Sequence, residues 1–190
     1  QARTGTMSME MHQSMILLSK EPVRPRYADP RVGWFSVTRT NFGLDEQKAA
    51  QETFIRRWHL EPSDLEAYAR GELVDPVKPI VYYIDPGTPE QWSSYVKQGV
   101  EDWQAAFETA GFSNAIIARD PPSPEEDPEW SGEDVRYSVV RWAANETRNA
   151  QGPSVSDPRT GEIIESDIVW YHNHMRSYRN RLMVETGAAN

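Results

Sequence analysis

Two histidines near the end of the chain, His172 and His174, are the residues whose type and spacing first suggest chemistry. On a strand, residues two apart leave the same face, so both imidazoles could bind one metal ion. On a helix they would diverge by about 200° and could not. A catalytic zinc ion needs three protein ligands and an open position for water. The other side chains that could complete such a site are two histidines and two carboxylates: His12, His59, Glu165 and Asp167.

No spacing favours any of these four as a third ligand. We therefore expect His172 and His174 to pack or cap at a strand-to-helix boundary, and a small metal site on this pair is the alternative. Ser154 and Ser156 lack the setting of a nucleophile elbow. Glu162, Glu165 and Asp167 alternate imperfectly on a strand, so a glycosidase carboxylate pair is not supported. The residues alone indicate no active site.

Composition restricts the possible partners. The formal charge of −9 argues against a nucleic-acid or anionic membrane surface as partner. The chain has no cysteine, so disulfides and thiolate zinc sites are excluded. No apolar run approaches the ~18 residues of a membrane span. The segment 120–134 holds seven acids, four prolines and no base, which favours a solvated loop; a calcium site is the alternative.

Residues 1–76 predict an extended, Pro-rich arm or the end of a preceding domain. Its four N-terminal methionines, Met7, Met9, Met11 and Met15, show no period. The segments "FSVTRT" and "TFIRRWHLE" predict strands, with Phe54, Trp58 and Leu60 as anchors, and "LDEQKAAQE" predicts at most a helical turn. "PSDLEAYARGEL" predicts a short helix with Ser63 as its N-cap and Gly71 as its stop.

Residues 77–190 predict an α+β fold. "KPIVYYIDP" is typical of a buried strand, and a long helix should follow from Thr88 to Ala110, capped by Thr88 and Gln91. Its predicted apolar face comprises Trp92, Tyr95, Val96, Val100, Trp103, Phe107 and Ala110, and we expect Trp92, Trp103 and Phe107 in the core. "NAIIARD" and "VRYSVVRWA" predict further strands, the first joined by a right-handed parallel crossover.

A turn and a final helix complete the expected elements. "DPRTG", residues 157–161, predicts a turn with glycine at positive φ, flanked by the strands "GPSVS" and "EIIESDIVWY". "MRSYRNRLMVE" predicts a helix with Met175, Tyr178 and Leu182 on one face. The expected architecture is a twisted mixed β-sheet backed by a long helix.

Three strings in this second half, "KPIVYYIDPGTPEQWSSYVKQGVEDWQAAFETAGFSNAIIARD", "DVRYSVVRW" and "GPSVSDPRTGEIIESDIVWYHN", are distinctive. They resemble the start of the catalytic domain in a family of large bacterial zinc-dependent metalloproteases of metzincin type. The string "LLSKEPVRPRYADPRVGWFSVTRTNFGLDEQKAAQETFIRRWHLEP" resembles the segment that precedes this domain in the same family. The resemblance covers about residues 15–190.

The resemblance implies a hydrolase that uses zinc held by an H-E-x-x-H helix and a further histidine, with the glutamate as general base. This chain has no H-E-x-x-H, so no ligand or base can be assigned to its residues, and zinc would belong to the parent enzyme. What the resemblance does imply is a metzincin-like upper subdomain whose edge strand binds the peptide substrate. That edge corresponds to Gly152, Pro153, Ser154, Val155 and Ser156, with the strand around 167–171 as its neighbour.

The leading hypothesis is therefore part of a zinc metallopeptidase, inactive alone, that supplies the substrate-binding edge and scaffold. Its partners would be a peptide or protein substrate and the rest of the catalytic domain. The alternative is a non-catalytic module that binds a peptide or glycan. The family resemblance suggests a periplasmic or extracellular location. The first and last residues, Gln1 and Asn190, suggest an excised piece, and we expect exposed apolar surface and self-association.

Overall fold

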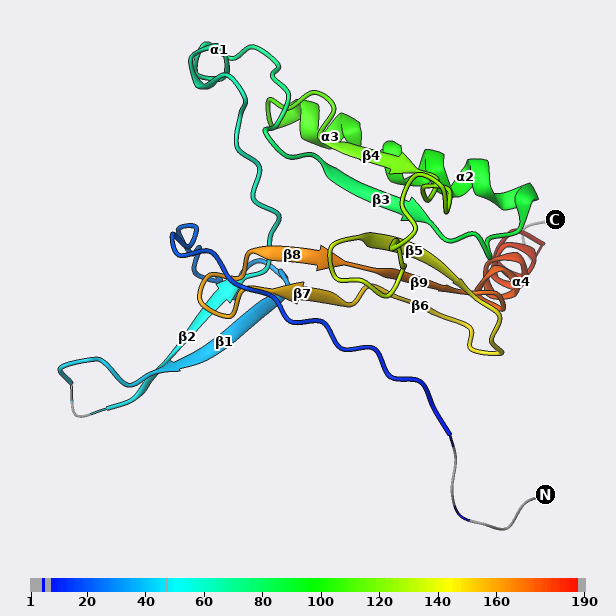
Figure 1. Cartoon of the computed structure of the whole chain (residues 1–190), viewed down its shortest axis with the longest axis horizontal. Helices are drawn as coiled ribbons and strands as arrows, with labels where there is room; N and C mark the ends of the chain where they lie inside the picture. Colours follow the sequence, from blue (N-terminus) through cyan, green and yellow to red (C-terminus); the bar gives the residue numbers. More distant parts are fainter. Residues whose placement is uncertain (1–4, 6–7, 47, 188–190) are drawn as a thin grey trace.

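In a computed structural model of the protein, residues 5, 8–46 and 48–187 are described. A five-stranded mixed sheet with the order β4-β3-β5-β9-β6 lies at the centre (Figure 1). Strands β3 (Ile80–Ile84), β4 (Ile116–Arg119), β5 (Ser138–Ala143) and β9 (Ile168–Tyr171) run parallel. Strand β6 (Ala150–Gln151) is antiparallel to β9 and forms an edge. The predicted α+β fold with a mixed sheet is confirmed.

Helices α2 (Glu90–Glu101) and α3 (Gln104–Thr109) cover one face of this sheet (Figure 1). The prediction of one helix from Thr88 to Ala110 is wrong in two respects. The helix begins at Glu90 and receives no side-chain cap, so the expected capping box does not form. It is also interrupted at Asp102, where a 3.4 Å hydrogen bond from the Trp103 amide to the Val100 carbonyl tightens the turn.

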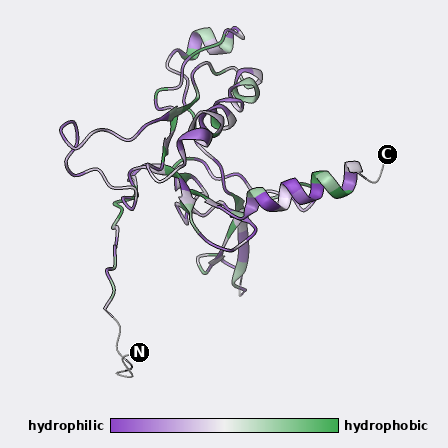
Figure 2. Cartoon of the chain, turned by 90° about the vertical axis from the view of Figure 1, so that its right-hand side faces the viewer, coloured by the Kyte–Doolittle hydropathy of each residue, from purple (hydrophilic) through white to green (hydrophobic). Residues whose placement is uncertain are grey.

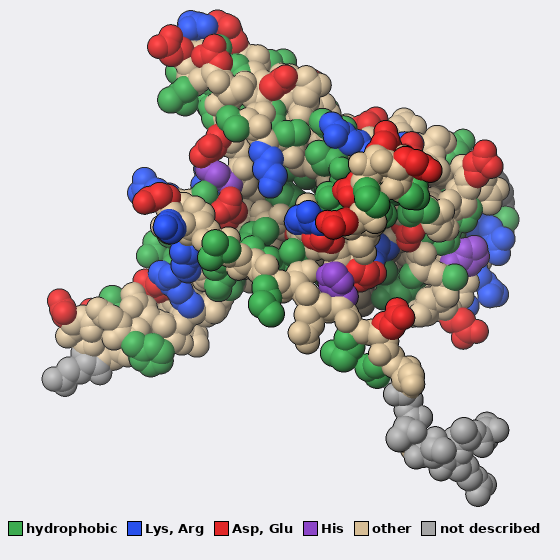
Figure 3. Space-filling view, viewed as in Figure 1, with side chains coloured by type: hydrophobic (Ala, Val, Ile, Leu, Met, Phe, Trp, Pro, Cys, Tyr) green, Lys and Arg blue, Asp and Glu red, His purple; other side chains and the backbone are tan. Residues whose placement is uncertain are grey.

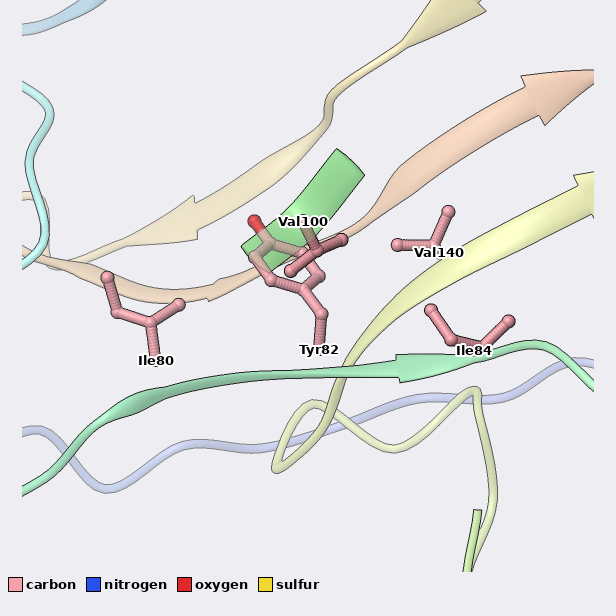
Figure 4. Packing of buried hydrophobic residues seen from close by; sticks show 5 residues of the cluster. All are labelled: Ile80, Tyr82, Ile84, Val100 and Val140. Atoms are coloured by element: carbon pink, nitrogen blue, oxygen red, sulfur yellow. The ribbon is translucent and has the colours of Figure 1, made fainter. Parts of the chain in front are cut away.

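The main core lies between this helical layer and the sheet. Alternate residues of β3, Ile80, Tyr82 and Ile84, point to the same face and meet Val100 of α2 and Val140 of β5 (Figure 4). Val96 and Phe107 complete the packing from the helices, and Trp58 and Leu60 pack against it as predicted. The expected burial of Trp103 is wrong, because its side chain is 64% exposed.

On the opposite face of the sheet, aromatic side chains from the acidic segment and from the residues just after it pack against β3. Tyr83 of β3 points to this face, and its ring centroid lies 5.9 Å from that of Trp130 and 5.5 Å from that of Tyr137. The Tyr137 hydroxyl donates to Asp127 at 3.1 Å. The segment 120–134 is therefore anchored by its aromatic and polar residues although most of its acids face solvent.

The N-terminal region contains a hairpin of β1 (Ser36–Asn41) and β2 (Ala50–Ile55). Residues 26–28 add to the other side of β2, through hydrogen bonds from Ala28 N to Thr53 O (2.8 Å) and from Ile55 N to Arg26 O (2.9 Å). Phe54 is fully buried, as predicted. The sequence predicts a helical turn in residues 44–52, but the described residues of that segment form bends and the start of β2. Of the four N-terminal methionines, Met7 lies outside the described residues.

A short helix, α1 (Leu65–Ala69), follows the hairpin. Its N-cap is Asp64, whose carboxylate accepts the Ala67 amide at 2.9 Å, so the prediction of Ser63 as the cap is wrong. Aspartate and serine are both good caps, and the chain geometry selects the residue one position later. Gly71 ends the helix at φ +83°, as predicted.

A second hairpin joins the N-terminal region to the main sheet. Strands β7 (Ser154–Ser156) and β8 (Ile163–Ser166) flank the predicted turn, in which Gly161 has φ +77°. The strand expected over 162–171 is divided at Asp167: β8 pairs with β7, whereas β9 enters the main sheet.

Helix α4 (His174–Gly187) ends the described chain and projects from the body (Figure 2). None of its described residues is buried, and Tyr178, Leu182 and Val184 are more than half exposed. Hydrophobic side chains also reach the surface on the protruding β1–β2 hairpin, where Phe35 and Phe42 are exposed (Figure 3). No described helix has the length and apolar character that crossing a bilayer requires.

The accessible surface of 14411 Å² is large for a chain of 21.8 kDa. A compact monomer of this mass exposes about 9,300 Å². The protruding β1–β2 hairpin, α4 and the extended segment of residues 8–20 all contribute exposed surface (Figures 1 and 2). Self-association through this surface stays a prediction.

Candidate functional site: a sheet edge and an adjacent acidic hollow

The five residues predicted to bind a peptide follow β6 along one side of the molecule (Figure 1). Strand β6 pairs with β9 and, in the described structure, has no second neighbour. Gly152 and Pro153 then link β6 to β7, and Ser154–Ser156 form β7, which pairs with β8 alone among the described strands. The five residues therefore connect the edges of two sheets rather than forming one strand.

The link between the two sheets is fixed by the backbone around Pro153. Its carbonyl oxygen accepts hydrogen bonds from the Asp167 amide (3.0 Å) and the Ser166 hydroxyl (3.2 Å). The same Asp167 marks the point where β8 passes into β9. Asp167 therefore ties the β6–β7 link to the start of β9 in the main sheet.

Asp167 is half-buried and its two carboxylate oxygens have partners on β5. Oδ1 accepts the Val139 amide at 2.9 Å, and Oδ2 accepts Arg141 Nε at 2.5 Å. The Arg141 guanidinium also donates to Glu133 and to the Gly132 carbonyl. Bonds of this charge-assisted kind are strong and directional, so they hold Asp167 and Arg141 in a fixed arrangement.

Glu165 lies beside this pair and is less well satisfied. It stands opposite Val155 in the β7–β8 register. Its Oε1 atom is buried and has no hydrogen-bond partner. Burial, together with the negative charge of Asp167, raises the pKa of Glu165 to about 7.

These side chains form one wall of an open hollow of about 270 Å³. The rest of its lining comes from three parts of the chain. These are the end of the acidic segment with the residues that follow it, strand β5 and the extended N-terminal segment, through Gly132, Glu133, Asp134, Val135, Tyr137, Arg141, His12 and Ser14. His12 and Ser14 hydrogen-bond each other at 3.1 Å and are both exposed. Carboxylates with a raised pKa that line a hollow are typical of functional sites.

The two histidines considered as ligands occupy different elements, because β9 ends at Tyr171. His172 is an exposed turn residue whose ring lies 5.8 Å from that of Trp142. His174 begins α4 and packs edge-on against Trp170 (5.0 Å) and Tyr178 (4.7 Å). The two-apart strand geometry that would aim both rings at one ion is not formed.

The remaining ligand candidates are also separated. His59 hydrogen-bonds Glu61 at 3.1 Å, far along the chain from the other histidines. Within residues 5, 8–46 and 48–187, no group of three or more His, Cys, Asp or Glu side chains could hold a metal ion. The described residues thus offer no pattern to which a zinc ion can be assigned.

The β7–β8 hairpin is locked to the N-terminal region on its other side. Arg57 N donates to Gly161 O at 3.0 Å, and Ile163 N donates to Arg57 O at 2.8 Å. Arg159 is held by Asp157 and donates to Ser19 O at 2.8 Å. The N-terminal region therefore supports the hairpin that carries half of the candidate edge.

Sequence reasoning placed the edge residues but did not connect them with Arg141, Glu133 or the hollow. A signal was present, since Arg141 is a charged residue in the apolar strand "VRYSVVRWA". A charge in the interior of a mostly parallel sheet requires a partner. The sequence does not show that Asp167, 26 residues later, is that partner.

The family model for a domain of unknown function (DUF5117) matches residues 1–63. No curated protein and no solved structure matches the chain. The matched segment covers the β1–β2 hairpin and ends between the core residue Leu60 and helix α1.

Proposed function

We propose that this chain supplies the peptide-binding edge and the supporting scaffold of a metzincin-type zinc metallopeptidase. The observation that carries the proposal is the one-sided edge from β6 to β7, at the positions where the resemblance expects substrate. An extended peptide can add to such an edge as a further strand, with main-chain hydrogen bonds providing affinity. The sheet behind the edge is backed by α2 and α3, which supports it as a rigid platform.

In this proposal the zinc ligands and the general base belong to sequence outside these 190 residues. Activation of water requires a metal with an open coordination position and a base within hydrogen-bond reach. The H-E-x-x-H motif, which would provide two ligands and the base, does not occur in this chain. The 190-residue chain should therefore bind peptide without cleaving it.

The first test measures strand addition. The probe is a labelled, blocked peptide of the sequence Ser-Thr-Val-Thr-Lys-Thr-Val-Thr-Ser, and binding is followed by fluorescence anisotropy. The control peptide has the same side chains but N-methyl groups at alternate amides, which removes the donors on one edge. Saturable binding that weakens at least tenfold on N-methylation is expected. Equal binding of the two peptides, or no binding, would remove strand addition as the mode of recognition.

The second test measures catalysis. The chain is incubated with zinc and a fluorogenic casein substrate, with and without a chelator. No chelator-sensitive hydrolysis is expected. Hydrolysis that disappears on addition of the chelator would contradict the placement of the ligands outside the chain.

A non-catalytic binding module is the second candidate, and the exposed aromatic residues Tyr95 and Trp103 favour it. They are 66% and 64% exposed and lie eight residues apart on the α2–α3 layer, as expected of a surface that stacks on a sugar or peptide. The gene sequence after codon 190 separates the two candidates. An H-E-x-x-H motif there favours the peptidase, and a gene without one favours the module.

A further inference from the structure

We infer that the hollow beside β7 selects a basic side chain, lysine or arginine, on the peptide that the edge binds. The inference rests on the proposed function, because it requires an extended segment along β7. It goes further by naming the chemical class of one substrate residue. The hollow is the one lined by Val155, Glu165, Asp167 and the acidic segment.

The strand register brings a bound residue within reach of the hollow. Val155 and Glu165 are directly opposite in the β7–β8 pair, so their side chains leave the same face. A peptide added to the outer edge of β7 would place one residue beside Val155, about 5 Å from it and about 10 Å from Glu165 in strand spacing. Val155 remains 39% exposed, which leaves an apolar surface between the added strand and the carboxylate.

The shape of lysine and arginine side chains allows them to extend from an added strand, over Val155, to Glu165. Both have an apolar stem that can lie on exposed hydrophobic surface and a charged end that reaches beyond it. A stem lying over Val155 would direct the ammonium or guanidinium group to Glu165. Short side chains at the same position would stop at Val155.

The charges around the hollow favour a cation. Among the described residues of the lining the one arginine is Arg141, which is already engaged by Asp167, Glu133 and the Gly132 carbonyl. Glu133 and Asp167 are paired with Arg141, and Asp134 is paired with Arg136. Glu165 is therefore the acid of the described lining that has no ion pair. A cation bound in the hollow would supply the missing counter-ion of the Glu165 carboxylate.

Other side-chain classes fit the hollow less well. An acidic side chain would meet Glu133, Glu165 and Asp167. An apolar side chain would cover Glu165 further without giving Oε1 a donor. The raised pKa of Glu165 agrees with a site in which a negative charge is left without its counter-ion.

The experiment compares three versions of the nonapeptide that differ at the central residue: lysine, norleucine and glutamate. Binding is measured by anisotropy to the wild-type chain, to Glu165→Gln and to Glu129→Gln. Glu129 is an exposed acid of the 120–134 segment outside the lining, so its substitution matches the change in net charge. The wild type and Glu129→Gln should bind the lysine peptide at least tenfold more tightly than the norleucine peptide. Glu165→Gln should lose that preference.

The outcomes distinguish the two proposals. If none of the peptides binds, the proposed function fails. If lysine and norleucine peptides bind with equal affinity, binding of a peptide by the edge is supported and the selection of a basic residue is refuted. Selection by general charge alone would appear as an equal loss in Glu129→Gln, and it would overturn the role of Glu165.

A second measurement uses only the wild-type chain and so does not depend on the folding of a variant. Raising sodium chloride from 0.05 M to 0.5 M should weaken the lysine peptide several-fold and leave the norleucine peptide nearly unchanged. Equal salt dependence of the two peptides would contradict the inference.

Discussion

Replacing Gly161 by alanine tests the contact between the β7–β8 hairpin and the N-terminal region. The residue has φ +77°, where an alanine costs about 1–2 kcal/mol. Its added Cβ would also collide with the Ile55 carbonyl oxygen, a backbone atom that cannot move aside alone. Relief of the collision would lengthen the two hydrogen bonds of Arg57 to Gly161 and Ile163, each contributing about 1 kcal/mol. We expect a total loss of about 3–4 kcal/mol in the free energy of unfolding.

Gly71→Ala provides the matched control. Gly71 has φ +83°, but no atom lies within 4 Å of the position that its Cβ would occupy. Gly71→Ala should therefore lose only the cost of placing alanine at positive φ, about 1–2 kcal/mol of the free energy of unfolding. Equilibrium unfolding in urea, followed by tryptophan fluorescence, measures both variants against the wild type. Equal losses in the two variants would refute the close approach of the hairpin to Ile55.

Three further outcomes follow from particular residues. Asp64→Ala should lose about 1 kcal/mol of unfolding free energy through the missing cap of α1, whereas Ser63→Ala should lose almost nothing; the reverse order would contradict the observed cap. Trp103→Ala should change the free energy of unfolding by less than about 0.5 kcal/mol because the side chain is exposed. Phe107 packs on both core clusters, so Phe107→Ala should cost about 2–3 kcal/mol. Comparable losses in the two variants would show that Trp103 is packed. Glu165→Gln should leave stability unchanged near pH 4 and raise it by about 1–2 kcal/mol above pH 7, after allowance for partial exposure. The sign follows because a carboxyl group with a raised folded-state pKa stabilises the protein below its ordinary pKa of about 4.5 and loses that contribution as the pH rises through about 7. Urea unfolding at both pH values measures the difference, and a variant that is less stable than the wild type at pH 8 would contradict the raised pKa.

The strands and helices were predictable where one local signal decides the outcome. The apolar run Ile80–Ile84 forms a buried strand, and the residues after Asp157 form the expected turn with Gly161 at positive φ. The break at Asp102 and the exposure of Trp103 were not predictable, because an apolar stripe does not show how wide a face the sheet covers.

The division at Asp167 depends on contacts distant in sequence. The stretch 162–171 contains no glycine or proline that would mark a break, and local patterning cannot show that it joins two sheets. Asp167 lies between β8 and β9, and its carboxylate accepts hydrogen bonds from the Val139 amide and from Arg141, which are 26–28 residues earlier in the chain. The candidate edge was thus placed by resemblance, and the charged hollow beside it appeared only with the tertiary structure.

The hydrogen bonds that join Arg57 to Gly161 and Ile163 connect residues about a hundred positions apart. At a synthesis rate of 5–20 residues per second, the ribosome needs about 5–20 s to make the intervening chain. During that interval the backbone amide and carbonyl of Arg57, just after β2, lack their partners in the β7–β8 hairpin. Contacts of such long range are slow to form because the closing loop is costly in entropy. In a nascent chain the backbone amide and carbonyl of Arg57 therefore remain hydrogen-bonded to water until the β7–β8 hairpin has been made.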